Sequence, residues 1–344
     1  MKLKLTDKLL ISEKSRPLVV AEISANHCGI KKRFLKHILL AKKSGADLVK
    51  IQTYEEKDIS INLKNLNKNY NLKNNYRIYK KTKTPFSWHK DAFKFAKKNN
   101  ITLFSSPFSI RAVDLLENLN CPIYKIASLE ITDFRLVKKI AKTGKPIIIS
   151  CGASTLTELK ETIKLINKYH NKIVIMYCRT SYPLVENLSN LNTILNIKKI
   201  FKNNFIGYSD HTNKNTTSLI SAILGAKIIE KHFIIDNKKT YDSKFSIKPK
   251  QLSDLKKNLN FNYDIIGYRK PYLLKDELSK RNYRRSIYAK KNIKKGSKFT
   301  FDNIVSLRPR TGICSSKYFK LINKKSKKNY LKNSPISKNE ILQK

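Results

Sequence analysis

The chain has 344 residues, which is enough to bury a large core and to form two or three domains. It carries 72 Lys and Arg against 25 Asp and Glu, a formal net charge of +47. Such an excess is typical of proteins that bind nucleic acid, but here the lysines are scattered singly and in pairs along the whole chain. We therefore expect a strongly solvated basic surface and no specific nucleic-acid partner.

The apolar runs are all short. None approaches the roughly 18 residues of a membrane-spanning helix, and the first residues are charged throughout, unlike the apolar core of a signal peptide. The five cysteines are scattered and show no CxxC spacing. The sequence thus predicts a soluble cytoplasmic protein without membrane association or a structural zinc site.

Eight short apolar segments alternate with segments of helical periodicity from residue 17 onward. They cover residues 17–24, 47–53, 101–107, 123–128, 146–150, 172–178, 205–210 and 226–233. Strands that are apolar throughout and alternate with helices predict a parallel sheet covered by helices on both faces. Eight such units in about 250 residues predict an α/β fold of the (β/α)8 type, a TIM barrel.

Two connections have features of their own. Residues 54–86 form the longest interruption, rich in Asn, Lys and Tyr, and follow the second predicted strand. We expect a partly helical lid over the barrel mouth there. Ser154, followed by Thr157 and Glu158, predicts the capped start of a helix.

The pattern changes near residue 260. We assign residues 1–262 to the barrel, 263–283 to a linker and 284–344 to a small β-rich domain. Turn-punctuated strands of this total length bury too little surface to be more than marginally stable alone. The small domain is therefore expected to lean on a partner.

Polar side chains stand at the ends of the predicted strands, the face that carries the active site in such barrels. His211 and His232 end two consecutive strands, so their imidazoles can reach one divalent cation such as Mn²⁺, Fe²⁺, Co²⁺ or Zn²⁺. Glu22, on the first strand beside the eighth, can orient or deprotonate a metal-bound water. The alternative is that each histidine is a core residue that donates to a nearby carbonyl.

The other half of the mouth combines amines with hydroxyls. These residues are Lys50, Ser106, Lys125, Ser128, Ser150, Thr180 and Ser209. Two amines with several hydroxyls match a ligand that carries a carboxylate and a phosphate. No GxxxxGK[ST] loop occurs, so a small phosphate ester is favoured over a nucleoside triphosphate. Any single one of these residues can also be a strand-end cap or a solvated amine.

Eight ordered motifs resemble the sialic acid synthase family, whose members condense phosphoenolpyruvate with an amino sugar. They are AEISANH, KIQTY, TPFSWH, FSSPF, YKIAS, GYSDHT, IEKHF and DSKFS. The C-terminal RRSIYAKKNIKKG and LRPRTG resemble that family's antifreeze-like SAF domain, a β-clip fold. The resemblance covers about residue 17 to the end.

Within the family, TPFSWH, KIQTY and YDSKFS are most similar to the pseudaminic acid synthases. The resemblance implies 2,4-diacetamido-2,4,6-trideoxy-altrose as the acceptor. N-acetylneuraminate or legionaminate synthesis is the alternative within the family. A basic nucleic-acid binder and a carbohydrate-binding protein without chemistry are the alternatives from other classes.

The resemblance also implies roles for single residues. It places a divalent metal, Mn²⁺ before Mg²⁺ or Co²⁺, on His211 and His232, and makes Glu22 catalytic. It assigns phosphoenolpyruvate to the same seven amines and hydroxyls named above. It assigns the sugar to Gln52, Tyr182, Asp242 and Arg308. Arg308 matches an arginine that reaches into the other subunit's site, which implies a domain-swapped homodimer.

Two departures from the family pattern fall near the predicted mouth. Arg179 stands in CRT where CTS is frequent, so it either tightens anion binding or points outward. Cys28 stands in ANHCG, and we expect it to enter the mouth.

Overall fold

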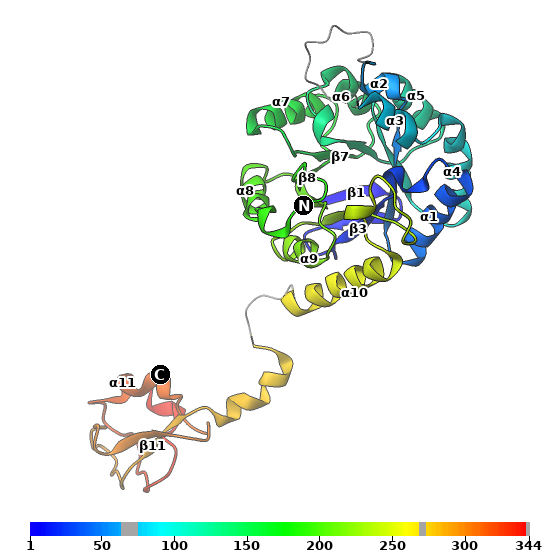
Figure 1. Ribbon diagram of the computed structural model, residues 1–344. Helices are drawn as coiled ribbons and strands as arrows, with labels where there is room; N and C mark the ends of the chain where they lie inside the picture. The colour runs from blue at the N-terminus through cyan, green and yellow to red at the C-terminus, as the bar shows by residue number, and fades with distance from the viewer. Residues whose placement is uncertain (63–74, 268–272, 342–344) are drawn as a thin grey trace. The chain divides into compact units, whose positions relative to one another are not determined.

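The computed structural model describes residues 1–62, 75–267 and 273–341 (Figure 1). The chain divides into two compact units, Met1–Gly267 and Tyr268–Lys344. Each unit is described by itself. Within the described residues, no helix combines the length and apolar character needed to cross a membrane.

Eight parallel strands close into a barrel, in the order β10-β3-β4-β5-β6-β7-β8-β9. They are β3 (Leu18–Glu22), β4 (Leu48–Thr53), β5 (Leu103–Pro107), β6 (Tyr124–Ile126), β7 (Ile147–Ser150), β8 (Ile173–Cys178), β9 (Phe205–Asp210) and β10 (Ile228–His232). Each of the eight predicted segments contains one of these strands, so the predicted TIM barrel is confirmed. Because β10 pairs with β3, the end of the last strand lies beside the end of the first.

Helices surround the barrel (Figure 1). They are α1 (Lys31–Lys43), α4 (Phe86–Lys98), α5 (Ile110–Asn118), α6 (Phe134–Ala141), α7 (Leu156–Asn167), α8 (Asn192–Ile200), α9 (Thr216–Ile223) and α10 (Pro249–Ile266). Most turn apolar residues inward, as α6 does with Leu136, Val137 and Ile140, whereas the buried residues of α9 are Thr217, Ser218 and Ser221. Burial of each such apolar side chain contributes about 1.5–3 kcal/mol to the stability of the fold. The buried side chains of the barrel and its helices form one hydrophobic core.

Short 3₁₀ helices lie in the connections at the carboxyl ends of the strands. In the barrel unit they span Ser24–His27, Ser128–Glu130, Glu186–Leu188 and Ser243–Phe245. These turns hold the residues that follow the strands close to the mouth.

An antiparallel hairpin that we did not predict precedes the barrel. It consists of β1 (Lys2–Thr6) and β2 (Leu9–Ser12), and its Leu5 and Ile11 are buried in the barrel core. Just before β10, Lys227 donates to the carbonyls of Glu13 and Ser15. The hairpin therefore lies at the amino-terminal end of the strands.

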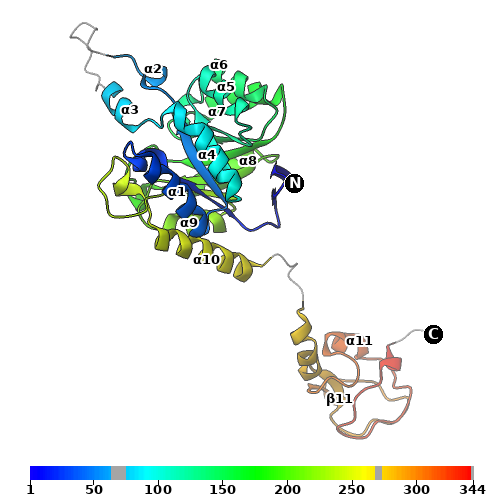
Figure 2. The same cartoon turned by 90° about the vertical axis from the view of Figure 1, so that its right-hand side faces the viewer.

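The connection after β4 contains two helices, α2 (Glu56–Ile59) and α3 (Tyr76–Thr82). This agrees with the predicted partly helical segment, of which residues 63–74 lie outside the described residues. The Tyr54 hydroxyl bonds Thr82 at 2.9 Å, and the Tyr54 ring packs against Tyr79 and Phe108. Figure 2 shows α2 and α3 at the opposite end of the barrel from the N-terminus.

The start of α7 differs by one residue from the prediction. Thr155, not Ser154, is the capping residue: its hydroxyl accepts from Glu158 N at 3.2 Å, and Glu158 accepts from Thr155 N. The Ser154 hydroxyl instead donates to the Cys151 carbonyl at 2.9 Å. The reciprocal spacing of three residues is satisfied only with Thr155 in the first position.

The second unit is small. Its elements are 3₁₀ turns at Lys275–Glu277, Ser279–Tyr283, Ser315–Lys317 and Lys338–Glu340, the antiparallel pair β11 (Ser286–Ala289) and β12 (Ile304–Leu307), and α11 (Tyr318–Leu321). Its core includes Ile287, Phe299 and Ile336. Residues 263–266, which we had placed in a linker, form the last turn of α10.

Candidate active site

A cavity of about 970 Å³ lies at the carboxyl ends of the barrel strands. Most predicted site residues line it. They are Lys50, Gln52, Ser106, Lys125, Ser128, Ser150, Thr180, Tyr182, Ser209, His211, His232 and Asp242. Glu22 is fully buried beside the cavity and accepts from Gln52 at 3.2 Å. Arg308 is exposed and belongs to the second unit.

A buried charge cluster forms the floor of this cavity. Glu230 accepts from Lys50 at 2.7 Å, from Lys125 at 3.1 and 3.2 Å and from Ser209 at 3.1 Å. Glu22 Oε2 lies 3.2 Å from the Lys50 ammonium. Two cations and two carboxylates are therefore packed together out of water, a costly arrangement that is tolerated only when each charge is paired.

Glu230 stands at the end of a predicted strand, but we assigned it no role in the site from the sequence. It lies two residues before His232 on β10, and side chains two apart on a strand share one face. That alternation is a signal by which IEKH could have identified it.

Burial and charge set different pKa values within the cluster. Burial alone raises the pKa of Glu230, but Lys125 and Lys50 outweigh it and hold that pKa far below its usual range. Burial raises the pKa of Glu22, against the attraction of Lys50 and His232. Of the two carboxyls, Glu230 keeps its charge and Glu22 is the one that protonates first.

The two lysines also differ. Burial lowers the pKa of Lys50, but the charges of Glu22 and Glu230 more than compensate, so that pKa lies above its ordinary value. For Lys125, burial is the dominant effect and, with the repulsion from Lys50, lowers the pKa to about 8. Lys50 is thus a permanent cation near neutral pH, whereas Lys125 titrates just above it.

His211 and His232 face each other with ring centroids 5.7 Å apart. His211 Nδ1 lies 2.7 Å from the carbonyl oxygen of Arg179. Since a carbonyl only accepts, Nδ1 donates and Nε2 carries the lone pair, which lies 3.3 Å from Ser209 Oγ. Burial and the nearby His232 lower the pKa of His211 to about 3, so its ring is neutral, the form that binds metals.

His232 has an unused nitrogen. Its Nδ1 is buried without a hydrogen bond and lies 3.6 Å from Asp242 Oδ2. The two imidazoles fit a cation that completes its coordination with substrate and water. Within the described ranges, no group of three or more His, Cys, Asp and Glu side chains is arranged to hold a metal ion.

The opposite side of the mouth is tied to the first strand. Asp242 accepts from Ala25 N at 3.2 Å, and Asn26 donates to the Phe233 carbonyl and to Ser246 Oγ, both at 2.9 Å. These bonds fix the loop after β10 that carries Asp242. On the side of the cavity assigned to the sugar, these hydrogen bonds therefore hold the side chains in one arrangement.

Like His232 Nδ1, Ser150 Oγ is a buried polar atom at the mouth without a hydrogen-bond partner. Ser150 also lines the cavity. A buried hydroxyl without a partner is uncommon, because it loses its bonds to water without replacing them. Ser150 thus lies where a polar ligand atom would satisfy it.

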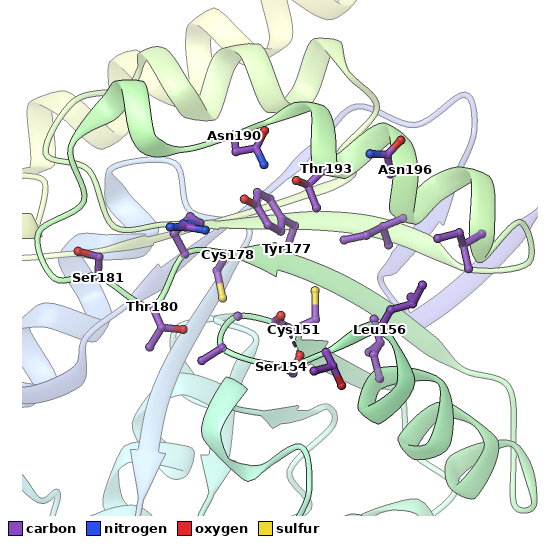
Figure 3. Close-up of a pocket in the computed structure, with 17 residues that line it drawn as sticks. Cys151, Ser154, Leu156, Tyr177, Cys178, Thr180, Ser181, Asn190, Thr193 and Asn196 are labelled. Carbon is purple, nitrogen blue, oxygen red and sulfur yellow. Dashed lines mark hydrogen bonds between the residues drawn. The ribbon is translucent and has the colours of Figure 1, made fainter.

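A second cavity of about 560 Å³ adjoins the mouth (Figure 3). It is lined by the loops after β7 and β8 and by α8, and it shares Cys178 and Thr180 with the mouth. Arg179 lines only this second cavity, so its side chain points away from the predicted anion contacts. A Cβ on Gly152 would lie 2.5 Å from Thr180 Oγ1 and 2.6 Å from Cys178 Sγ.

The expectation that Cys28 enters the mouth is wrong. Cys28 lines a separate cavity of about 440 Å³ with Lys81 and Lys239. It follows the 3₁₀ helix at the end of β3 with a φ of 54°, and this left-handed turn directs the chain toward α1.

The chain is similar to one family of known proteins over most of its length. Residues 37–270 match the NeuB family and residues 284–342 match the SAF domain. The pseudaminic acid synthase of Helicobacter pylori is 37% identical, over 94% of this chain and 98% of that relative. The pseudaminic acid synthase of Campylobacter jejuni is 35% identical over 90% and 92%. The N,N'-diacetyllegionaminic acid synthase of Campylobacter jejuni is 36% identical over 92% and 97%.

Solved structures show the same fold. The N-acetylneuraminic acid synthetase of Leptospira borgpetersenii, in complex with citrate, has a TM-score of 0.75 and 26% identity, and covers 83% of this chain and 96% of that one. A putative spore coat polysaccharide biosynthesis protein E from Chromobacterium violaceum has a TM-score of 0.82 and 20% identity, over 94% and 98%.

Proposed function

Because the chain belongs to the NeuB family, we propose that it is an enzyme that makes pseudaminic acid. It condenses phosphoenolpyruvate with 2,4-diacetamido-2,4,6-trideoxy-altrose and releases phosphate. The observation that carries this proposal is the buried cluster of Lys50, Lys125 and Glu230 next to the two facing histidines. The side with the lysines suits an anion, and the side with the two histidines suits the oxygen of a polarised carbonyl.

Phosphoenolpyruvate binds over the lysines in this proposal. Lys50 and Lys125 neutralise its carboxylate and phosphate, which lowers the cost of bringing the anion into a buried site. Ser150 supplies its unpaired hydroxyl to the same ligand. The remaining hydroxyls assigned to phosphoenolpyruvate are Ser106, Ser128, Thr180 and Ser209.

His211 and His232 would hold a divalent metal, Mn²⁺ before Mg²⁺ or Co²⁺. The Nε2 lone pair of His211 and the Nδ1 of His232, which has no hydrogen bond, support this assignment. When bound, the metal would supply a Lewis acid that polarises the aldehyde of the open-chain sugar.

The reaction forms one carbon–carbon bond and breaks one carbon–oxygen bond. Carbon 3 of phosphoenolpyruvate attacks the aldehyde carbon, whose oxygen takes up a proton and becomes a hydroxyl. Water adds at carbon 2, and the bond from carbon 2 to the phosphate oxygen then breaks to release phosphate and leave the keto acid. Glu22, whose pKa is raised by burial, accepts the proton of that water.

The acceptor contacts are assigned to Gln52, Tyr182 and Asp242, with Arg308 contributed by a second copy. We propose a cytoplasmic, domain-swapped homodimer for this reason. The exposed position of Arg308 and the small core of the second unit support the proposal. Legionaminate synthesis is the second candidate, because a legionaminate synthase shows nearly the same identity to the chain as the pseudaminate synthases do.

Phosphate release from phosphoenolpyruvate tests the function. The purified chain is incubated with Mn²⁺ and, separately, with the altrose derivative, the legionaminate precursor and N-acetylmannosamine. Release with the altrose sugar alone, abolished in the His211→Ala, His232→Ala double variant, is the expected result. Release with another acceptor instead would overturn the substrate assignment, and no release from folded, metal-loaded protein would overturn the enzyme assignment.

A further inference from the structure

A buried ion pair lies directly behind the two histidines. Asp210 and Lys231 each precede one histidine in the chain, so strand alternation turns them to the opposite face of the sheet. The two are partners in the register between β9 and β10, and their charged atoms are 3.2 Å apart. Both side chains are fully buried.

Besides its ion pair with Lys231, Asp210 accepts hydrogen bonds from the chain that follows His211. Its carboxylate accepts from Thr212 N at 2.9 Å, from Thr217 Oγ1 at 2.7 Å and from Ser218 Oγ at 2.5 Å. These donors lie in the loop after β9 and in the first turn of α9. The carboxylate therefore holds the turn by which the chain leaves β9.

Lys231 bonds the same turn from the neighbouring strand. Its ammonium donates to the carbonyl oxygens of Thr212 at 2.6 Å and Lys214 at 2.9 Å. A residue on β10 thus fixes the backbone just after His211, the residue that follows β9. The direction of one histidine is coupled to the strand that carries the other.

Stability alone does not account for this pair. A buried ion pair costs much of its Coulomb attraction in lost hydration, and apolar residues of similar size often fold as well. Its partners, however, are satisfied in only one register of β9 against β10 and one course of residues 212–214. The pair therefore selects one geometry among those that an apolar interface would permit.

Metal coordination needs such a selection. Two imidazoles on different strands share one ion only if both nitrogens lie about 2.0–2.2 Å from it, within a tolerance of about 0.2 Å. On this basis we propose that Asp210 and Lys231 are positioning residues of the metal site, which set the separation and direction of His211 and His232. The inference rests on the proposed function, since it takes these histidines to be the ligands.

The test measures Mn²⁺ affinity without substrates. Free Mn²⁺ is followed by electron paramagnetic resonance during titration of the full-length chain, its Asp210→Asn variant and its Lys231→Met variant. Lys256→Met is the matched control, because Lys256 pairs with Asp47 at 2.6 Å away from the mouth. We expect the Kd for Mn²⁺ to rise about 10- to 100-fold in the two test variants and to stay unchanged in the control.

A second readout separates positioning from general damage. If the substitution only displaces the two histidines, kcat recovers at high Mn²⁺. If it partly unfolds the protein, kcat is lower at every Mn²⁺ concentration. Where a single variant fails to fold, the double variant Asp210→Leu, Lys231→Met removes both charges at once and is titrated instead. An unchanged Kd in folded variants overturns the inference. Equal binding by the wild type and the His211→Ala, His232→Ala variant overturns the metal site itself.

Discussion

Two sets of ion pairs, one at each end of the barrel, differ in how deeply their side chains are buried. At the amino end, the pair Lys256–Asp47 keeps about a fifth of each side chain exposed, and Arg16–Asp264 is about half exposed. At the carboxyl end, the charges around Glu230 are at most 7% exposed. Exposed pairs are nearly neutral for stability, whereas buried charges are expensive. A fold retains the expensive kind where a ligand needs it, so changes at the two ends should differ in what they damage.

The largest effect is expected from the histidines. His211→Ala or His232→Ala should lower kcat by about 10³-fold or more, because polarisation of the aldehyde is lost. The Tm should change little, since neither side chain is part of the apolar core. Phosphate release and a thermal melt on the same sample check both statements. A variant with normal kcat would remove the histidines from the chemistry.

Glu230→Gln comes next, because it removes the charge that anchors both lysines. We expect kcat/KM for phosphoenolpyruvate to fall about 10²-fold, since the ammonium groups are no longer held in place. The free energy of unfolding should fall by about 3–5 kcal/mol, as for other broken buried pairs. Urea unfolding and initial rates measure the two losses. A stable variant with normal kinetics would contradict the role of the cluster.

The pH dependence sharpens the comparison within the carboxyl end. The pKa of Lys125 is lowered to about 8, so its ammonium is present below that pH and is lost above it. We expect kcat/KM for phosphoenolpyruvate to fall about tenfold per pH unit above about pH 8. Lys125→Arg, which keeps its charge, should move this fall to higher pH. An identical profile in both proteins would assign the titration to another group.

Gly152→Ala probes the wall between the two cavities. The added Cβ would overlap Thr180 and Cys178, so a loop at the mouth must shift. We expect a loss of about 1–3 kcal/mol in unfolding free energy and a several-fold rise in KM for phosphoenolpyruvate. Gly144→Ala is the control, since its Cβ would meet nothing within 4 Å although its φ is 68°. Because Gly152 has no positive φ, unchanged stability and KM in Gly152→Ala would show that the loop accommodates the added Cβ.

The smallest effect is expected at the amino end. Lys256→Met should change the unfolding free energy by about 1 kcal/mol or less and leave the kinetics unchanged. Chemical denaturation together with kcat/KM is sufficient to check this. A large loss of activity would erase the contrast between the two ends.

Most of the barrel could be predicted from the sequence, because its strands are apolar throughout and the helices between them are periodic. The residues at the strand ends were found for the same reason, since a barrel brings these ends together. Ser150 and Lys125, far apart in the sequence, line one cavity as expected. The local sequence pattern was enough to predict a side chain's position where that position depends only on the end of its own strand.

Other features depend on contacts that no local pattern displays. The hairpin β1–β2 has charged residues in its first strand and its turn, and only its packing under the barrel reveals Leu5 and Ile11 as core. Arg179 lines the second cavity, and its carbonyl oxygen accepts from His211, a partner 32 residues away in the sequence. Ser154 and Thr155 are adjacent hydroxyl residues that could each cap the helix, and Thr155 is the one that does. In each case a distant or competing partner decided the outcome.

The closure of the barrel has a consequence for synthesis. His232 is the register partner of Glu22, and Phe233 N donates to the Glu22 carbonyl at 2.8 Å. These residues are separated by about 210 positions, so a ribosome working at about 5–20 residues per second takes roughly 10–40 seconds to travel between them. During that time β3 has an open edge, and the nascent chain lacks His232 and, until residue 211 is made, His211 as well. The mouth of the barrel therefore forms late, when the last strand meets the first.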